Sequence, residues 1–195
     1  MNDAQRVLEH ERCRRSAHYF IFESKMRTKD EHDLSDPVKP FPDLPYLRLI
    51  VDVLLVGGKF LAPTEARYAR EGGVDPRWLQ MVSESGLTFL EKSRQMMVSW
   101  VVCAYLLWRA KYYPHQLILL QSKREEDAAS MVYNKEPYIA RISFLEQALP
   151  KHLRTLVFPR AGAYCHLFFP NASHIWGIPE GADLIRSNTA SVVFS

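Results

Sequence analysis

The feature that most constrains the fold is a change of pattern between Thr88 and Trp108. A short β-prone run, Thr88 to Glu91, leads into a compact polar loop, and the loop opens directly into an apolar segment of helical length. A strand, a phosphate-binding loop and a helix N-terminus in this order build a P-loop, in which a lysine and a Ser or Thr supply charge and a metal contact. The stretch therefore predicts a nucleotide-binding α/β domain.

The loop departs from the standard consensus, G-x-x-x-x-G-K-[ST], because Met97 and Val98 occupy the Gly-Lys positions. Ser99 still stands where the metal-binding hydroxyl belongs, and Lys92 lies seven residues before it. A lysine that enters from the strand side can bring its ammonium to the β- and γ-phosphates, since phosphoryl transfer depends mainly on placed charge. We predict Lys92 as the phosphate-binding cation and Ser99 as the Mg²⁺ ligand. Taken alone, the loop also fits an ordinary β-α connection with solvated basic residues.

The loop resembles the deviant Walker A loop of large terminase subunits, the ATP-driven DNA-packaging motors of tailed phages. Part of that family carries its loop lysine at the start, in patterns such as K-S-R-Q-M-G-x-S, and the family's usual glycine is Met97 here. The resemblance implies ATP and Mg²⁺ as cofactors. It also implies nucleotide contacts along the whole loop: Lys92, Ser93, Arg94, Gln95, Met96, Met97, Val98 and Ser99.

Other segments follow in the family's order. The segments that resemble its lead-in to the ATPase core are Tyr19–Phe22, Thr28–Asp33, Pro37–Pro42 and Tyr46–Arg48. Leu117–Ala128 resembles its second core strand and the following helix. Phe169–Arg186 and Ser191–Ser195 resemble the approach to Walker B.

A few residues have candidate roles beyond those of Lys92 and Ser99, each with a simpler alternative. Phe41 and Tyr46 are candidates for adenine contacts, and plain packing of the lead-in is the alternative. Arg94 can touch phosphate or reach a neighbouring subunit, or else pair with a carboxylate. Arg186 is a candidate charge-stabilising finger, or an ordinary surface arginine. The basic interval from Gln147 to Pro179, which holds no Asp or Glu, suggests a DNA-facing patch or packing residues.

The family resemblance implies double-stranded DNA, a small terminase subunit and a portal protein as partners. It also implies a homo-oligomeric ring in the cytoplasm of an infected bacterial host. In the family, a catalytic carboxylate pair directly follows a run like Ser191–Ser195, and a nuclease domain lies beyond. We therefore expect the front part of a motor, from a truncated gene, a split gene or a partial sequence. Such a fragment should bind nucleotide weakly and not hydrolyse it.

Two other functions remain open from the sequence. A helicase-type P-loop DNA translocase is the first, although such proteins usually keep the Gly-Lys that Met97-Val98 replaces. A non-catalytic remnant that serves as a binding or assembly protein is the second. Nucleotide binding without turnover would favour the second.

Composition adds limits. The chain has 195 residues, 47% hydrophobic and 24% charged, with a net charge of +3, as expected of one globular α/β domain. Cys13, Cys103 and Cys165 form no C-x-x-C pair, which argues against a disulfide framework or a zinc site and fits a reducing cytosol. No secretory signal is evident, and the apolar run from Met96 to Trp108 is too short to span a membrane.

The pattern predicts a P-loop NTPase-like, mostly parallel sheet covered by helices, incomplete at its C-terminus and carrying a β-hairpin insertion. Residues 1–45 form a helical and Pro-rich lead-in, and residues 46–195 the ATPase part. Expected helices are 2–24, 46–56, 76–85, 99–112 and 138–149, plus one capped by Ser122 and Glu125. Expected strands are 88–91, 116–121, 163–169, 174–178 and 191–195, and residues 28–45 are expected to be an extended loop without strands.

Overall fold

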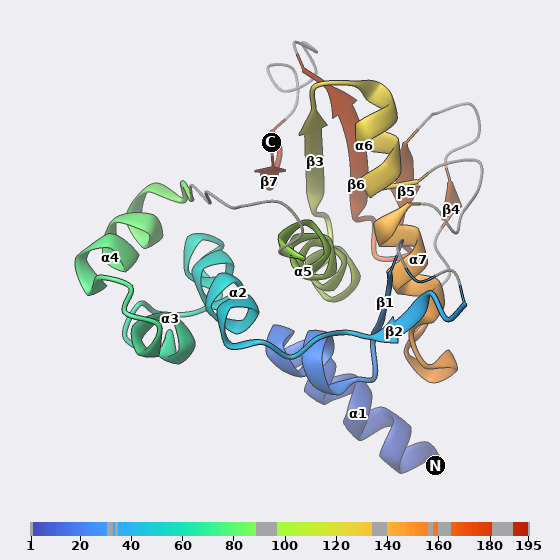
Figure 1. Cartoon of the computed structure of the whole chain (residues 1–195), viewed down its shortest axis with the longest axis horizontal. Helices are drawn as coiled ribbons and strands as arrows, with labels where there is room; N and C mark the ends of the chain where they lie inside the picture. The colour runs from blue at the N-terminus through green and yellow to red at the C-terminus, as the bar shows by residue number, and fades with distance from the viewer. Residues whose placement is uncertain are drawn as a thin grey trace. The chain divides into compact units, whose positions relative to one another are not determined.

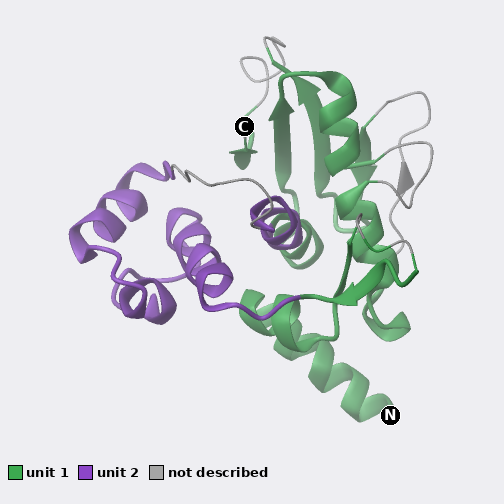
Figure 2. Cartoon of the chain, in the orientation of Figure 1, with its two compact units in different colours: residues 1–41, 106–195 green, residues 42–105 purple. Residues whose placement is uncertain are grey.

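A computed structural model describes residues 2–30, 33, 35–88, 97–133, 140–155, 158–159, 165–180 and 189–194. The chain divides into two compact units, coloured separately in Figure 2. Unit 1 comprises Met1–Phe41 and Leu106–Ser195, and unit 2 comprises Pro42–Tyr105. The division between a lead-in and an ATPase part at residue 45 stays a prediction.

Unit 1 is an α/β structure built on a mixed, partly parallel sheet (Figure 1). Its strand order is β4-β5-β6-β3-β7. The strands are β3 (Leu117–Ser122), β4 (Phe158–Pro159), β5 (His166–Phe168), β6 (His174–Pro179) and β7 (Val192–Phe194). The pairs β3–β6 and β3–β7 are parallel, whereas β4–β5 and β5–β6 are antiparallel. The sheet is therefore mixed in the described residues, and not mostly parallel as the sequence pattern predicted.

The predicted hairpin is confirmed, with β5 and β6 antiparallel on either side of the Pro170–Ser173 turn. Its place in the sheet differs from the prediction. β6 also pairs in parallel with β3 over six residues, from Leu117 opposite His174 to Ser122 opposite Pro179. The hairpin therefore belongs to the main sheet and is not an appendage to it. The second strand of a hairpin can occupy a central position in a sheet when its apolar side chains are buried like those of the neighbouring strands.

Helix α6 (Glu125–Met131) lies against β3 and β6 (Figure 1). Gly177 makes this contact possible, since a Cβ there would lie 3.1 Å from the Cβ of Ala128. The predicted cap of this helix is wrong: Arg124 is its N-cap, and no side chain bonds to the helix end. Ser122 instead ends β3, where its carbonyl accepts a hydrogen bond from the N–H of Glu180. Strand pairing has outcompeted the local capping signal.

The remaining helices of unit 1 are α1 (Asp3–Arg15), the π-helix η1 (Tyr19–Glu23), α7 (Arg141–Ala148) and the 3₁₀ helix η2 (Lys151–Leu153). The C-terminal half of α5 (Val98–Tyr112) also belongs here. The single helix predicted for residues 2–24 is interrupted at Ser16, whose backbone is extended. The Trp108 indole Nε1 donates to the carbonyl of Cys13 at 2.8 Å, which ties α1 to α5.

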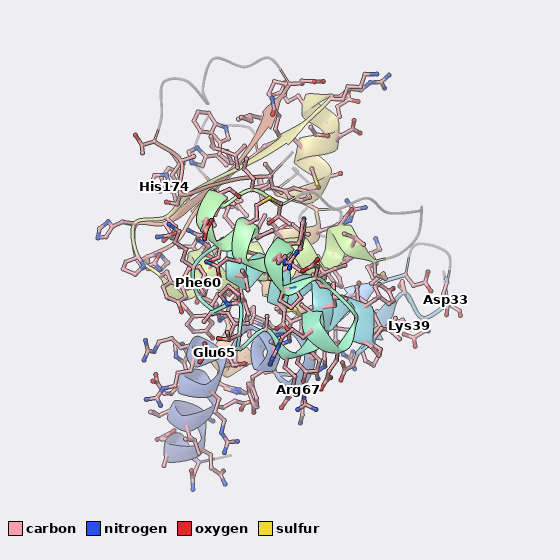
Figure 3. The ribbon with its side chains drawn as sticks, turned by 90° about the vertical axis from the view of Figure 1, so that its left-hand side faces the viewer. Asp33, Lys39, Phe60, Glu65, Arg67 and His174 are labelled. Carbon is pink, nitrogen blue, oxygen red and sulfur yellow. The ribbon has the colours of Figure 1, made fainter. Side chains whose placement is uncertain are left out.

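The segment expected to be a strandless loop contains a separate antiparallel sheet of β1 (Arg27–Lys29) and β2 (Val38–Pro40). The prolines argued against strands, but Pro40 sits at the last position of β2, where a missing N–H is tolerated. Lys39 forms ion pairs with Asp33 at 2.8 Å and Asp36 at 3.3 Å, and Figure 3 shows the side chains of Asp33 and Lys39 close together. These pairs hold the connection between the strands.

Unit 2 is helical, with α2 (Pro45–Gly57), α3 (Arg67–Glu71), α4 (Pro76–Ser85) and the N-terminal half of α5. The predicted start of α4 is confirmed, because the Asp75 carboxylate accepts from the N–H of Arg77 and Pro76 begins the helix. Its predicted stop is confirmed as well: Gly86 has a φ of 68°. The hydrophobic core of unit 2 consists of Val53, Val56, Ala66, Ala69, Leu79 and Val82. No helix in the described parts of the two units is long and apolar enough to cross a membrane.

Candidate nucleotide-binding site

The predicted site residues fall into two groups. Lys92, Ser93, Arg94, Gln95, Met96 and Arg186 lie outside the described residues, as does the predicted strand 88–91 apart from Thr88. The structure describes Met97, Val98 and Ser99 at the end of the loop, and also Phe41 and Tyr46. The described part of the predicted P-loop is therefore its helix side, from Met97 onward.

Helix α5 begins at Val98, directly after Met97 and one residue before the predicted start at Ser99. The carbonyl of Met97 accepts hydrogen bonds from the N–H groups of Trp100 and Val101, both at 3.0 Å, so Met97 is the last residue before the helix. Its φ is 55°, in the left-handed region that glycine adopts most easily. Met97 therefore has the left-handed backbone conformation that suits glycine, the usual residue at this position in the family whose loop it resembles.

Ser99 lies in the first turn of α5, after the buried Val98. The N-terminal amides of a helix and its dipole attract phosphate, and a hydroxyl in the first turn can reach a metal ion on that phosphate. No group of three or more His, Cys, Asp and Glu side chains that could hold a metal ion occurs in the described residues. The position of Ser99 fits a single hydroxyl ligand to a Mg²⁺ ion that is otherwise held by nucleotide oxygens and water.

The two described ends of the loop, Thr88 and Met97, both belong to unit 2. A Cβ on Gly57 would lie 3.0 Å from the Thr88 hydroxyl oxygen, so Thr88 is seated against the end of α2. The Tyr105 hydroxyl, on α5, donates to the carbonyl of Leu54 on α2 at 3.1 Å. A Cβ on Gly58 would lie only 2.6 Å from that hydroxyl. The Gly57-Gly58 pair, which follows the helix predicted for residues 46–56, therefore makes room for Thr88 and Tyr105.

The C-terminal end of α5 is held by contacts that sequence reasoning missed. The Asn171 side-chain amide, in the β5–β6 turn, donates to the carbonyls of Ala110, Lys111 and Tyr113 at 2.9, 3.2 and 3.2 Å. The Ser173 hydroxyl donates to the carbonyl of Tyr113 at 2.7 Å. These donors satisfy carbonyls that a helix end leaves without partners. The sequence indicated the segment that holds Asn171 and Ser173 only as a turn between two strands.

Arg109 links α5 to the starts of two strands. Its guanidinium donates to the Gln116 side-chain oxygen at 2.9 Å and to the carbonyl of Ser191 at 3.3 Å. The N–H of Leu117 donates to the Ser191 hydroxyl, and the N–H of Ser191 donates to the carbonyl of Leu117. The helix that follows the loop is thus bonded to the point where β7 begins beside β3.

The parallel strands β3, β6 and β7 end at one edge of the sheet, because they run in the same direction. Ligands of open α/β sheets bind beyond such carboxyl ends. Lys123 and Arg124 follow β3 at this edge and are exposed, and the exposed Glu180 follows β6. The two basic residues were not among the predicted site residues, and they supply positive charge at the edge where phosphate is expected.

Phe41 and Tyr46 belong to different units. Phe41 is buried in unit 1, where its ring meets that of Phe22 edge-on and its N–H donates to the carbonyl of Met26. Tyr46 is half-buried in the first turn of α2. Packing accounts for the placement of Phe41, and adenine contact by either ring stays a prediction.

Several basic residues considered for DNA contact have local partners. His152 lies 2.8 Å from the Glu9 carboxylate, and the Arg154 side chain donates to the carbonyl of Leu149 at 2.7 Å. On α1, outside the interval considered for DNA contact, Arg14 and Arg15 both bond to Glu11, and these bonds lower the pKa of its carboxyl to about 2. These contacts favour a structural role for the residues that make them.

A comparison of the sequence with models of known protein families finds no match, and a search of curated proteins finds none either. The resemblance to large terminase subunits consequently rests on the residues of the loop and on the order of the flanking segments. The geometry of the described residues adds the helix start after Met97 and the parallel strands β3, β6 and β7.

Proposed function

We propose that this chain is the N-terminal part of the ATPase domain of a phage large terminase subunit, and that it binds Mg-ATP through its deviant Walker A loop. Lys92 contacts the phosphates, and Ser99 supplies a hydroxyl to Mg²⁺. One observation carries the proposal: α5 starts directly after Met97, which has a φ of 55°, and Ser99 lies in its first turn. A helix that begins after a left-handed residue presents its amides to the loop, as phosphate binding requires.

The sheet gives independent support. β3 is the strand that the resemblance equates with the family's second core strand, and β7 is the strand equated with the approach to Walker B. The two are parallel neighbours, with Ile118 opposite Val192 and Leu120 opposite Phe194. A P-loop NTPase-like sheet needs parallel strands whose carboxyl ends converge on the nucleotide. Binding to double-stranded DNA, a small terminase subunit and a portal protein, and assembly into a ring, belong to the same proposal.

Nucleotide binding by the 195-residue chain is the direct test. We expect Mg-ATP to bind weakly in a calorimetric or fluorescent-analogue titration, without phosphate release. Lys92→Ala should reduce affinity by about tenfold or more, because one charge-assisted phosphate contact contributes roughly 1.5–3 kcal/mol. Ser99→Ala should reduce the dependence of binding on Mg²⁺. Lys151→Ala, which removes an exposed lysine of η2, is the matched control and should bind as the parent does.

The possible results of this titration test the role of Lys92, the role of Ser99 and nucleotide binding separately. Equal affinity for Mg-ATP in the parent and Lys92→Ala would refute the role of Lys92 and direct attention to Arg94. Absence of any nucleotide binding by a folded parent chain would refute the proposed function. Binding of ATP that is indifferent to Mg²⁺ would remove Ser99 from the site while leaving the phosphate contact in place.

A further inference from the structure

Two histidines of unit 1 face one another on one side of the β5–β6 hairpin. The Nε2 atom of His166, on β5, lies 3.3 Å from the Nδ1 atom of His174, on β6, which is labelled in Figure 3. The two residues lie diagonally across the hairpin, since His166 is opposite Trp176 and Phe168 is opposite His174. Their side chains therefore share one face of the sheet. Neither histidine belongs to the proposed nucleotide site.

The separation of the two nitrogens allows a hydrogen bond between the rings, and it also suits two ligands of one metal ion. In the absence of a metal ion, one ring donates its N–H to the ring nitrogen of the other. Two nitrogens bound to one tetrahedral Zn²⁺, with Zn–N bonds of ~2.0–2.1 Å, lie ~3.3–3.4 Å apart. The observed 3.3 Å equals that tetrahedral edge. One Nε2 and one Nδ1 is an allowed combination, because either ring nitrogen of a neutral histidine can ligate.

Aromatic neighbours fix both imidazoles in this arrangement. The His166 ring stacks on Trp176, with centroids 4.7 Å apart and an interplanar angle of 1°, and on Phe168 at 4.5 Å and 27°. The His174 ring lies 4.3 Å from Phe168. His166 is buried, whereas His174 is half-buried and gives access from the surface. Rings held in place by packing lose little freedom when a metal binds, and an apolar surround limits the access of water to the site.

From this geometry we propose that His166 and His174 form a binding site for one borderline divalent ion of the Zn²⁺ class. Imidazole nitrogen suits Zn²⁺, Co²⁺, Ni²⁺ and Cu²⁺, and not Mg²⁺ or Ca²⁺. Among the described residues no third His, Cys, Asp or Glu completes the set. Water or an exogenous ligand fills the remaining positions, as in zinc sites that keep open positions for chemistry. The affinity is consequently modest, and Mg²⁺ at Ser99 does not compete for this site.

The test is a Zn²⁺ titration of the purified 195-residue chain after chelator treatment, followed by calorimetry and by the ¹⁵N resonances of the histidine rings. We expect one ion per chain and Zn²⁺-induced shifts at the Nε2 of His166 and the Nδ1 of His174. His174→Gln should weaken binding by about tenfold or more, because it removes a ligand. His115→Asn is the control: His115 is exposed with a φ of 57°, a conformation that Asn tolerates.

A second measurement guards against a variant that folds poorly. Zn²⁺ should raise the Tm of the parent and of His115→Asn, and leave that of His174→Gln unchanged, since an ion stabilises the state that binds it. Circular dichroism shows whether a variant is unfolded. If it is, the histidine ring resonances of the parent chain decide whether His166 and His174 bind Zn²⁺. Shifts at other histidines, no saturable binding below about 1 mM, or undiminished binding to folded His174→Gln would each overturn the proposal. Lys92→Ala should leave Zn²⁺ binding intact, so a failed nucleotide assignment does not affect this outcome.

Discussion

Asn171 caps helix α5 from a distance in sequence: its side-chain amide donates to the carbonyl oxygen of Ala110, 2.9 Å away. The same amide reaches the carbonyls of Lys111 and Tyr113, and its own carbonyl oxygen accepts from the N–H of Ser173. The β5–β6 turn therefore terminates the helix that follows the proposed phosphate loop. One side chain satisfies several carbonyls that would otherwise be left without donors.

Asn171→Ala should lower the free energy of unfolding by about 1–3 kcal/mol, because it leaves partly buried carbonyls without their donor. Asn171→Asp should be at least as destabilising, since a carboxylate cannot donate and places negative charge at the helix C-terminus. Urea denaturation measures both. Gln80→Ala, which removes an exposed amide of α4, should change stability by less than about 0.5 kcal/mol. Equal stability of Asn171→Ala and the parent would show that water replaces the amide.

Lys111 and Glu146 form a buried ion pair between α5 and α7, with Nζ–O distances of 2.8 and 3.0 Å. Thr155 completes it, accepting from the Lys111 ammonium and donating its N–H to Glu146. Burial lowers the pKa of Lys111 and raises that of Glu146, while each partner opposes the effect on the other. Removal of one partner leaves an uncompensated buried charge.

Lys111→Met alone should therefore destabilise the chain by about 3–5 kcal/mol, whereas the double variant Lys111→Met/Glu146→Leu should recover most of that loss. Denaturant unfolding of the two single variants and the double variant gives the coupling energy between the side chains. Additive effects of the two substitutions would contradict the pairing.

Met97→Gly should raise the affinity for Mg-ATP, because the backbone can then approach phosphate without a side chain at a φ of 55°. Stability should change by less than about 1 kcal/mol, since relief of left-handed strain is offset by the greater freedom of glycine in the unfolded chain. Met97→Ala is the control, because it shortens the side chain and keeps the strain. An unchanged or lower affinity in Met97→Gly would mean that the loop is adapted to methionine.

The thiols should be unreactive in the native state. Burial raises the pKa of both Cys13 and Cys165 to about 12, and Cys103 is buried as well. Thiolates are the reactive form, so DTNB should label none of the three at pH 8 until the chain unfolds. Trp108→Phe removes the hydrogen bond to the Cys13 carbonyl and should speed labelling of Cys13 by loosening α1. Immediate labelling of the parent would show that α1 is undocked in solution.

The elements predicted correctly from the sequence are those with local signals. Asp75 and Gly86 define α4 through a cap and a left-handed stop, and an apolar run defines β3. Predictions were wrong where the structure depends on pairing between strands that are separated in sequence. Pro37 and Pro40 hid the β1–β2 sheet, whose pairing tolerates proline at a strand end, and Ser122 lost its predicted capping role to the β3 ladder.

The candidate site divides in the same way. The start of α5 at Val98 was predicted to within one residue, at Ser99, from a motif that is continuous in sequence. The contacts that hold this helix come from elsewhere: Tyr105 bonds to α2, and Asn171 lies in a turn about sixty residues beyond the helix. Such contacts have no local pattern, because the sequence separation between partners is set by the topology of the chain.

The β5–β6 turn also bears on how this chain can be engineered. Short polar hairpin turns are usual places to insert an epitope, a fluorophore or new chain termini, because they tolerate extra residues. Here Asn171 and Ser173 hold the end of α5, and the carbonyl of Asn171 accepts from the N–H of His115. A label spliced between Pro170 and Ser173 would release a helix that lies far from it in sequence. The exposed Gly73 ahead of α4, where an added side chain would meet nothing within 4 Å, offers a safer splice point.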